Sequence, residues 1–212
     1  FIQFHYDLYR GHKFAIPFLR FDEMNTLDPK KNPAFEFCEA QYFLAVDSEA
    51  RIVGRIAGII NHRANEEWNK KQVRFGWFDF VDNVAVSCAL LRAVENWGKS
   101  KGMNECVGPL GFTDMDREGL LIEGFDRKST MYINYNYPYY KDYLEKLSDA
   151  FRISEIKVVV VVFPSLPVTP IILHGHILIS NSISVVTIAP LSSSFLSSRT
   201  VGRQLGDLII KS

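Results

Sequence analysis

The chain has 212 residues, of which 47% are apolar and 23% charged, and this balance excludes a disordered or collagen-like chain. It carries 24 basic and 24 acidic residues, and the resulting net charge of zero argues against nucleic acid or a membrane surface as its partner. Three cysteines without paired spacing indicate reduced thiols and a cytoplasmic protein. The sequence begins at Phe1 with neither a methionine nor a signal-peptide pattern, so we expect its true start to be missing.

The first half of the chain predicts a helix, a loop and a hairpin. Residues 1–20 place apolar side chains at roughly helical spacing, and Pro17 is expected to end or kink that helix. Residues 21–37 predict a loop, because they contain Asp-Pro and Asn-Pro dipeptides that favour turns. Residues 41–46 and 51–61 read as two strands around a turn, which predicts a β-hairpin.

The second hairpin strand has Gly54 and Gly58 on the same face as three isoleucines, which indicates a bulge or a close approach of another backbone. Residues 62–72 predict a connection with a short helix near 66–70. The aromatic run at 73–81 predicts the third strand.

The clearest helix is predicted over residues 83–101, which end before a glycine suited to stop a helix. A short strand over 105–108 and a helix near Tyr139–Leu147 follow. This order predicts an α/β (α+β) fold with one mixed sheet flanked by helices. The apolar positions expected to bury the long helix are Val86, Leu90, Val94 and Trp97.

The composition changes sharply near Lys157. No Asp, Glu, Lys or Arg occurs between Val158 and Ser198, and serines cluster near the end of that run. We therefore divide the chain into a domain over 1–157 and a tail over 158–212. Three interpretations of the tail stay open: native buried strands, a membrane anchor, and out-of-frame translation. The candidate strands of the tail are Val158–Phe163 and Ile171–Ile179.

Four segments within residues 1–150 carry a resemblance to a known family. They are F-G-W-F-D-F at 75–80, A-L-L-R-A-V-E-N-W-G-K-S-K-G-M at 89–103, G-P-L-G-F-T-D-M-D-R-E-G-L-L-I-E-G-F-D at 108–126 and Y-N-Y-P-Y-Y-K-D-Y-L-E-K-L at 135–147. With them the chain resembles the GNAT superfamily of acyl-CoA-dependent N-acyltransferases, and more narrowly a bacterial GNAT-like family with a degenerate cofactor loop. The resemblance implies a GNAT-like mixed sheet, here with the first strand missing and atypical C-terminal strands.

The resemblance also implies a co-substrate, acetyl-CoA or another acyl-CoA, between the strands at 73–81 and 105–108. The turn after the third strand, F-V-D-N-V-A-V-S, lacks the glycines and arginine on which a pyrophosphate normally sits. A non-catalytic GNAT-like ligand-binding module therefore remains the alternative to an enzyme. The positions that the resemblance assigns to the cofactor are Phe78, Phe80, Val81 and Asn83.

Two clusters are candidates for the chemistry of acyl transfer. Five carboxylates lie within residues 114–126, and a buried carboxylate with a raised pKa would serve as the base that takes the proton of the amine. Six tyrosines lie within residues 132–143, and one of them would act as the acid. The candidate catalytic residues are Asp114, Asp116, Glu118, Tyr140 and Tyr143.

The expected function is an acyl-CoA-dependent N-acyltransferase that acts on a small amine or a peptide amine. At the position where the family usually has its acid tyrosine, this chain has Leu144, one residue beyond Tyr143. The family's acid therefore cannot be assigned directly to a residue of this chain. No metal cofactor is expected, because His174 and His176 alternate in an apolar run with no third ligand nearby.

Overall fold

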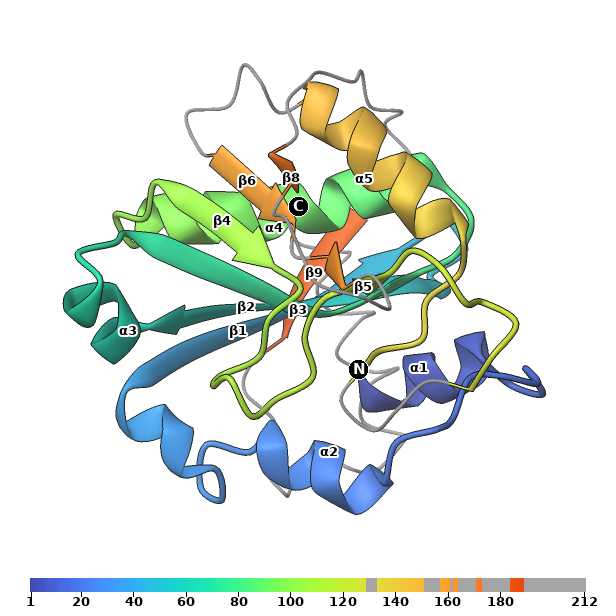
Figure 1. The fold of residues 1–212 in the computed structure, drawn as a ribbon, viewed down its shortest axis with the longest axis horizontal. Helices are drawn as coiled ribbons and strands as arrows, with labels where there is room; N and C mark the ends of the chain where they lie inside the picture. Colours follow the sequence, from blue (N-terminus) through green and yellow to red (C-terminus); the bar gives the residue numbers. More distant parts are fainter. Residues whose placement is uncertain (129–132, 151–156, 161, 164–170, 173–183, 189–212) are drawn as a thin grey trace.

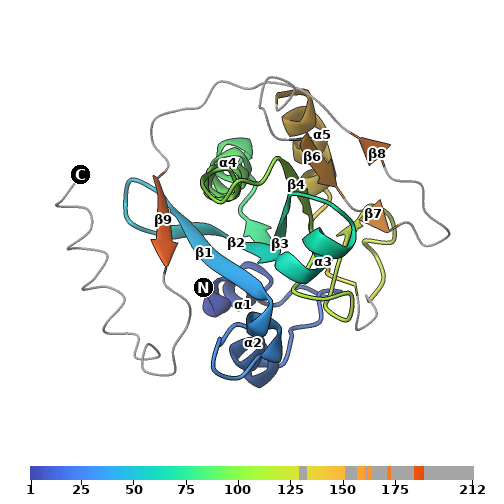
Figure 2. The same ribbon diagram turned by 90° about the vertical axis from the view of Figure 1, so that its left-hand side faces the viewer.

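The computed structural model describes residues 1–128, 133–150, 157–160, 162–163, 171–172 and 184–188. Among these residues seven strands form one sheet in the order β8-β6-β4-β3-β2-β1-β9, as Figures 1 and 2 show. The strands are β1 (Cys38–Val46), β2 (Ile52–Asn61), β3 (Gln72–Phe80), β4 (Glu105–Gly108), β6 (Lys157–Val160), β8 (Ile171–Ile172) and β9 (Ser184–Ile188), and β5 (Leu120–Leu121) pairs separately with β7 (Val162–Phe163).

The sheet is mixed, as the sequence predicted. Neighbouring strands from β1 to β3 are antiparallel, whereas β3, β4 and β6 run parallel to one another. The parallel strands are joined by helices, which is the connection that parallel neighbours require. The helices are α1 (Ile2–Leu8), α2 (Arg20–Thr26), α3 (His62–Glu67), α4 (Val84–Ser100) and α5 (Tyr139–Ala150), together with the 3₁₀ helix η1 (Pro33–Glu36). The fold is therefore α/β.

The side chains of β1 and β2 alternate between two cores, one on each face of the sheet. On one face α4 covers the sheet, with the predicted residues Val86, Leu90 and Val94 buried. A Cβ atom on Gly54 would lie 2.8 Å from Leu90 Cδ1, so the predicted close approach at that glycine is made by α4. The opposite face is covered by α1 and α2 (Figure 2).

Two predictions about the N-terminal region are wrong. The predicted helix within 1–20 ends at Leu8, well before Pro17. The predicted loop over 21–37 contains α2 and η1. The seven-residue α2 is too short to be stable alone in water, and it forms because its buried residue Glu23 is held by contacts distant in the sequence.

Strand β3 bends away from β4 near its middle. Only residues 72–74 pair with β4, and Leu110 then donates its N–H to the Phe75 carbonyl at 2.8 Å. The register with β2 shifts beyond Gly76, and Trp77 has a φ of 47°, which marks a β-bulge. The two parallel strands therefore part, and the bulge turns the second half of β3 toward α1 and α2.

Parts of the predicted tail belong to the same sheet as the first 157 residues. Strand β6 pairs with β4, and β9 pairs with β1 at the other end of the sheet. The rest of the predicted strand Ile171–Ile179, and His174 and His176, lie outside the described residues. No helix in the described part of the chain is both long and apolar enough to cross a membrane.

Candidate functional site

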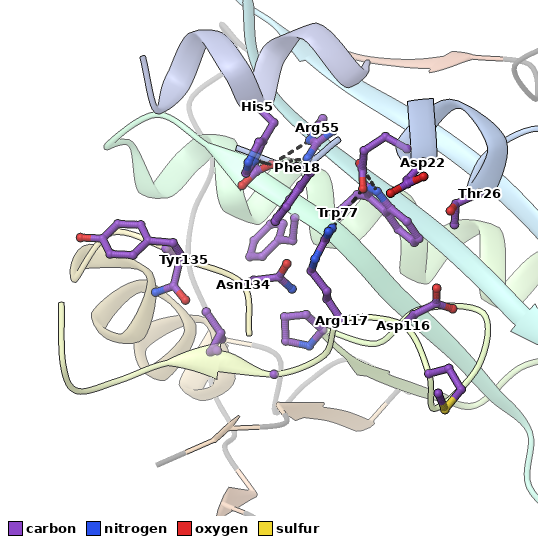
Figure 3. A pocket seen from close by; sticks show the side chains of 18 residues that line it. His5, Phe18, Asp22, Thr26, Arg55, Trp77, Asp116, Arg117, Asn134 and Tyr135 are labelled. Carbon is purple, nitrogen blue, oxygen red and sulfur yellow. Dashed lines mark hydrogen bonds and ion pairs between the residues drawn. The ribbon is translucent and has the colours of Figure 1, made fainter. Parts of the chain in front are cut away.

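A cavity of about 220 Å³ lies where the bulged half of β3 meets α1, α2 and the loop that follows β4. Figure 3 shows its walls, with His5 and Arg55 on one side and Arg117 and Asp116 reaching in from the loop. Trp77 and Asp79 line the cavity because the bulge turns this part of β3 toward it. The cavity therefore combines charged groups from four separate parts of the chain.

The charged centre of the cavity is Asp79, whose carboxylate is held between two cationic or protonatable groups. Its Oδ2 accepts a hydrogen bond from Nε of Arg55 at 2.7 Å and lies 3.0 Å from Nδ1 of His5. All three residues are buried, with 6% of Asp79, 1% of Arg55 and 5% of His5 exposed. Burial opposes ionisation, but Arg55, followed by His5, outweighs it and holds the pKa of Asp79 well below its usual range.

The ionised Asp79 orients the imidazole of His5. A carboxylate can only accept a hydrogen bond, so Nδ1 of His5 carries the hydrogen and the neutral ring has its lone pair on Nε2. His5 also stacks on Phe18, with 4.4 Å between ring centroids and 13° between planes. Because His5 lines the cavity and Nε2 has no hydrogen-bond partner among the described residues, this atom is available to a bound molecule.

A row of hydroxyl groups connects Asp79 with the edge of β3. The Tyr9 hydroxyl lies 3.5 Å from Asp79 Oδ1 and 3.4 Å from the Tyr140 hydroxyl. The Tyr140 oxygen in turn accepts the N–H of Phe80 at 3.1 Å. Burial, followed by neighbouring acidic groups, raises the pKa values of Tyr9 and Tyr140 well above their usual range, so both hydroxyls stay protonated.

A second buried carboxylate, Glu23, fixes the opposite wall of the cavity. It accepts a hydrogen bond from Trp77 Nε1 at 2.8 Å and pairs with Arg117 at 3.2 Å. The Arg117 guanidinium also lies 3.5 Å from the centre of the Phe18 ring, a cation–π contact. These contacts tie α2 and the loop after β4 to the bulged residue of β3.

The predicted acidic residues of the loop lie in different environments. Asp114 is exposed, whereas Asp116 lines the cavity and accepts the Thr113 N–H at 2.9 Å. Glu118 is half-buried, and its pKa is raised by burial and then by Asp114. Glu118 is not among the residues that line the cavity, so of the three predicted carboxylates the structure brings only Asp116 to it.

The two predicted catalytic tyrosines also lie in different environments. Tyr140 is 1% exposed and reaches the cavity only through Tyr9 and Asp79. The Tyr143 hydroxyl instead donates to Asp82 Oδ1 at 2.5 Å, in the turn between β3 and α4. The hydroxyls of the two predicted acids thus contact different groups, the Phe80 N–H and the Asp82 carboxylate.

The predicted cofactor residues lie along the end of β3 and the start of α4. Phe78 and Phe80 are buried, and Asn83 caps α4 by accepting the Ala85 N–H at 2.9 Å. Tyr139 donates its hydroxyl to the Phe80 carbonyl at 2.7 Å, while Tyr140 accepts the Phe80 N–H. Val81 is half-buried, and its N–H donates to β2. Both backbone groups of Phe80 are therefore already hydrogen-bonded within the chain.

Sequence reasoning missed the centre of the site, which consists of His5, Arg55 and Asp79. A signal was available, because Arg55 is the one charged residue of β2 and Asp79 lies in the aromatic second half of β3. Buried charges of this kind need partners, and opposite charges on neighbouring strands are natural ones. Nothing in the sequence near His5 points to Asp79, which is 74 residues away.

The described residues contain no group of three or more His, Cys, Asp or Glu side chains that could hold a metal ion. The three cysteines are buried and unpaired. Burial raises the pKa of Cys38 to about 11, which leaves it a poor nucleophile at neutral pH. The side chains on the cavity wall that can accept a proton are the imidazole of His5 and the carboxylates of Asp22, Glu23, Asp79 and Asp116.

Comparison with known proteins finds two relatives, and each matches only part of this chain. Protein YghO of Escherichia coli (strain K12) is 35% identical over 147 residues, which are 69% of this chain and 37% of that protein. A bacterial ceramide synthase of Caulobacter vibrioides is 35% identical over 106 residues, which are 50% of this chain and 27% of that protein. The chain thus spans less than two fifths of either relative's length. No family model matches the sequence, and no solved structure is significantly similar to it.

Proposed function

We propose that the chain is an N-acyltransferase that moves an acyl group from acyl-CoA to a primary amine. The observation that carries this proposal is the His5–Asp79 pair, because His5 lines a cavity beside the point where two parallel strands part. The GNAT-like order of elements supports the same activity. An enzyme that uses acyl-CoA would work in the cytoplasm, where this metabolite is made.

In the proposed reaction the nitrogen of the amine attacks the thioester carbonyl carbon. The new C–N bond forms, the C–S bond breaks, and CoA leaves as a thiolate. The amine must lose a proton to become an amide, and Nε2 of His5 accepts it. The ionised Asp79 stabilises the imidazolium that results, and the proton is then available to the thiolate.

The relatives widen the class of acceptor beyond a small amine or a peptide amine. A ceramide is the amide of a fatty acid with a long-chain amino alcohol, so a ceramide synthase makes an N-acylated lipid. We include a long-chain amino alcohol among the proposed acceptors. The polar groups of Asp116 and Thr26 on the cavity wall are suited to hydrogen-bond its hydroxyl groups.

A second candidate function is a ligand-binding module without catalysis. The hydroxyls of Tyr139 and Tyr140 occupy the backbone groups of Phe80, where the resemblance expects the cofactor to pair. Asp82 stands in the turn where a pyrophosphate would need donors. These contacts favour a protein that binds an amine in the cavity and holds no acyl-CoA.

The test is an incubation of the full chain with acyl-CoA donors of two and sixteen carbons and with a panel of amines that includes a long-chain amino alcohol. Release of free CoA thiol would be followed with a thiol reagent, and the amide would be detected by mass spectrometry. Enzymatic acyl transfer predicts equal amounts of thiol and amide. Calorimetric binding of an amine with neither product would overturn the enzyme and support the binding module.

A further inference from the structure

Three of the large apolar side chains that are most exposed in the described part of the chain lie within six residues of one another. They are Ile16, Leu19 and Phe21, with 48%, 70% and 70% of their surfaces exposed. They belong to the segment Arg10–Phe21, which leads from α1 into the first turn of α2, in the lower right of Figure 1. Isolated exposed apolar residues are common, but a group of this kind marks an interaction site.

The same segment is locally basic although the whole chain is neutral. It contains Arg10, Lys13 and Arg20 and no Asp or Glu, and of these cations Arg10 is ion-paired with Asp7 of α1. Lys13 and Arg20 lie over the aromatic rings of Phe14 and Tyr6, and neither forms an ion pair with any residue that the structure describes. Cations beside exposed apolar groups are the composition that binds at the surface of an anionic bilayer.

The segment borders the mouth of the cavity. Phe18, in the middle of the segment, turns inward to stack on His5, so its neighbours on either side remain outside. Met115, on the loop after β4, lines the cavity and is 76% exposed. Exposed apolar side chains therefore stand on two sides of the cavity, next to the proposed base.

We propose that Arg10–Phe21 docks on the surface of an anionic lipid bilayer. Leu19, Phe21 and Ile16 would enter the boundary between headgroups and acyl chains, and the cations would meet lipid phosphates. The cavity would then open toward the bilayer, from which a long-chain amine could enter it. This last consequence rests on the proposed function, whereas the docking itself does not.

A bilayer fits this surface better than a second copy of the chain does. Two-fold pairing of the segment with itself would bring Lys13 and Arg20 against the same two cations of the second copy, and neither forms an ion pair within the part of the chain that the structure describes. An anionic surface meets the same charges with opposite charge. The sequence-based argument against a membrane surface rested on the net charge of the whole chain, which hides this local excess.

The experiment is flotation of the full chain with vesicles of phosphatidylcholine alone or with 30% phosphatidylglycerol added, without donor or acceptor. We expect binding to the anionic vesicles that weakens when the salt concentration is raised. The variant Leu19→Ser/Phe21→Ser should lose roughly tenfold or more of its partitioning. The variant Lys13→Gln/Arg20→Gln, which leaves the apolar groups in place, should lose a similar amount on anionic vesicles.

The matched control is Trp68→Ser, which removes an apolar residue that is 57% exposed at the end of α3, away from the segment. It should bind vesicles as the unchanged chain does, and melting temperatures should agree among all variants. The proposal would be overturned if the chain did not bind vesicles, or if Trp68→Ser lost as much binding as the segment variants. It would also be overturned if the chain formed concentration-dependent dimers that Leu19→Ser/Phe21→Ser abolishes. Vesicle binding without amide formation would support the docking and reject the acyltransferase. Amide formation without vesicle binding would support the acyltransferase and reject the docking.

Discussion

At the scale of single residues, the fold buries ionic groups that a stability argument alone would not select. Arg55 and Asp79 are almost fully enclosed, and desolvating such a pair costs about as much as their attraction returns. An apolar pair would pack the sheet equally well. Arg55 and Asp79 line the cavity, and Asp79 contacts His5. The presence of this pair is therefore better explained by a role in the site than by the stability of the core.

The Asp79→Asn variant tests this arrangement through its pH dependence. The pKa of Asp79 is lowered in the folded state, so ionised Asp79 stabilises the fold above its unfolded pKa of about 4. At pH 7 we expect the variant to lose about 3 to 5 kcal/mol, because Arg55 keeps a buried charge without its partner. The difference from the unchanged chain should shrink progressively as the pH falls below about 5.

Urea unfolding measured at several pH values checks this prediction. Asp126→Asn is the control, because that carboxylate is exposed and its contact with Arg127 is 4.0 Å long. A difference for Asp79→Asn that stays constant from pH 7 to pH 3 would contradict an ionised, stabilising Asp79.

Glu23 supports the opposite wall, and its removal should be costly in a different way. Glu23→Ala leaves the Trp77 N–H without its acceptor and Arg117 without its carboxylate, which should destabilise the fold by roughly 2 to 3 kcal/mol. Glu23→Gln keeps an acceptor for the indole and should lose less. Asp22→Ala, one residue earlier and exposed, should change stability by no more than about 0.5 kcal/mol. Equal unfolding midpoints for Glu23→Ala and Asp22→Ala would contradict the role of the buried carboxylate.

At the scale of elements, the site depends on where β3 and β4 separate. A Cβ atom on Gly76 would lie 2.4 Å from the Leu110 carbonyl oxygen, so only glycine permits the two backbones to approach there. The approach lets the chain after β4 cross over β3 and form the cavity wall.

We expect Gly76→Ala to destabilise the chain by roughly 3 kcal/mol or more, because backbone has to shift. Gly11→Ala is the matched control: its φ of 74° is unfavourable for alanine, but no atom lies within 4 Å of the new Cβ, so it should cost about 1 kcal/mol. Thermal unfolding of the two variants gives the comparison. Similar melting temperatures would show that the approach of the two backbones is not needed.

The sequence predicted the strands β1 to β4 and the long helix α4 well, whereas it missed the short helices α2 and η1. The boundaries of β2, β3 and α4 lie within about two residues of their predictions, because long periodic runs carry their own signal. The helix α2 was missed because its stability comes from Glu23, whose partners follow 54 and 94 residues later. The same limitation hid His5, so the local clusters that were predicted lie mostly around the cavity rather than in it.

At the scale of the whole molecule, charge is arranged locally while the total cancels. The buried centre combines Asp79 with Arg55 and His5, whereas on the surface Lys13 and Arg20 have no ion-pair partner among the described residues. The sheet also joins distant parts of the chain, since β9 near residue 186 pairs with β1. Net charge and composition of the whole chain therefore give no information about these local arrangements.

The central claim is that acyl transfer takes place in the cavity with His5 as the base, and a single-turnover measurement of amide formation tests it most directly. Gln at position 5 can still donate a hydrogen bond to Asp79 but cannot take a proton, so His5→Gln should slow the step by about a hundredfold or more. The control His62→Gln alters a histidine that lies 3.0 Å from Glu39 on the surface, and its rate should equal that of the unchanged chain. Equal rates for His5→Gln and the unchanged chain would contradict the account.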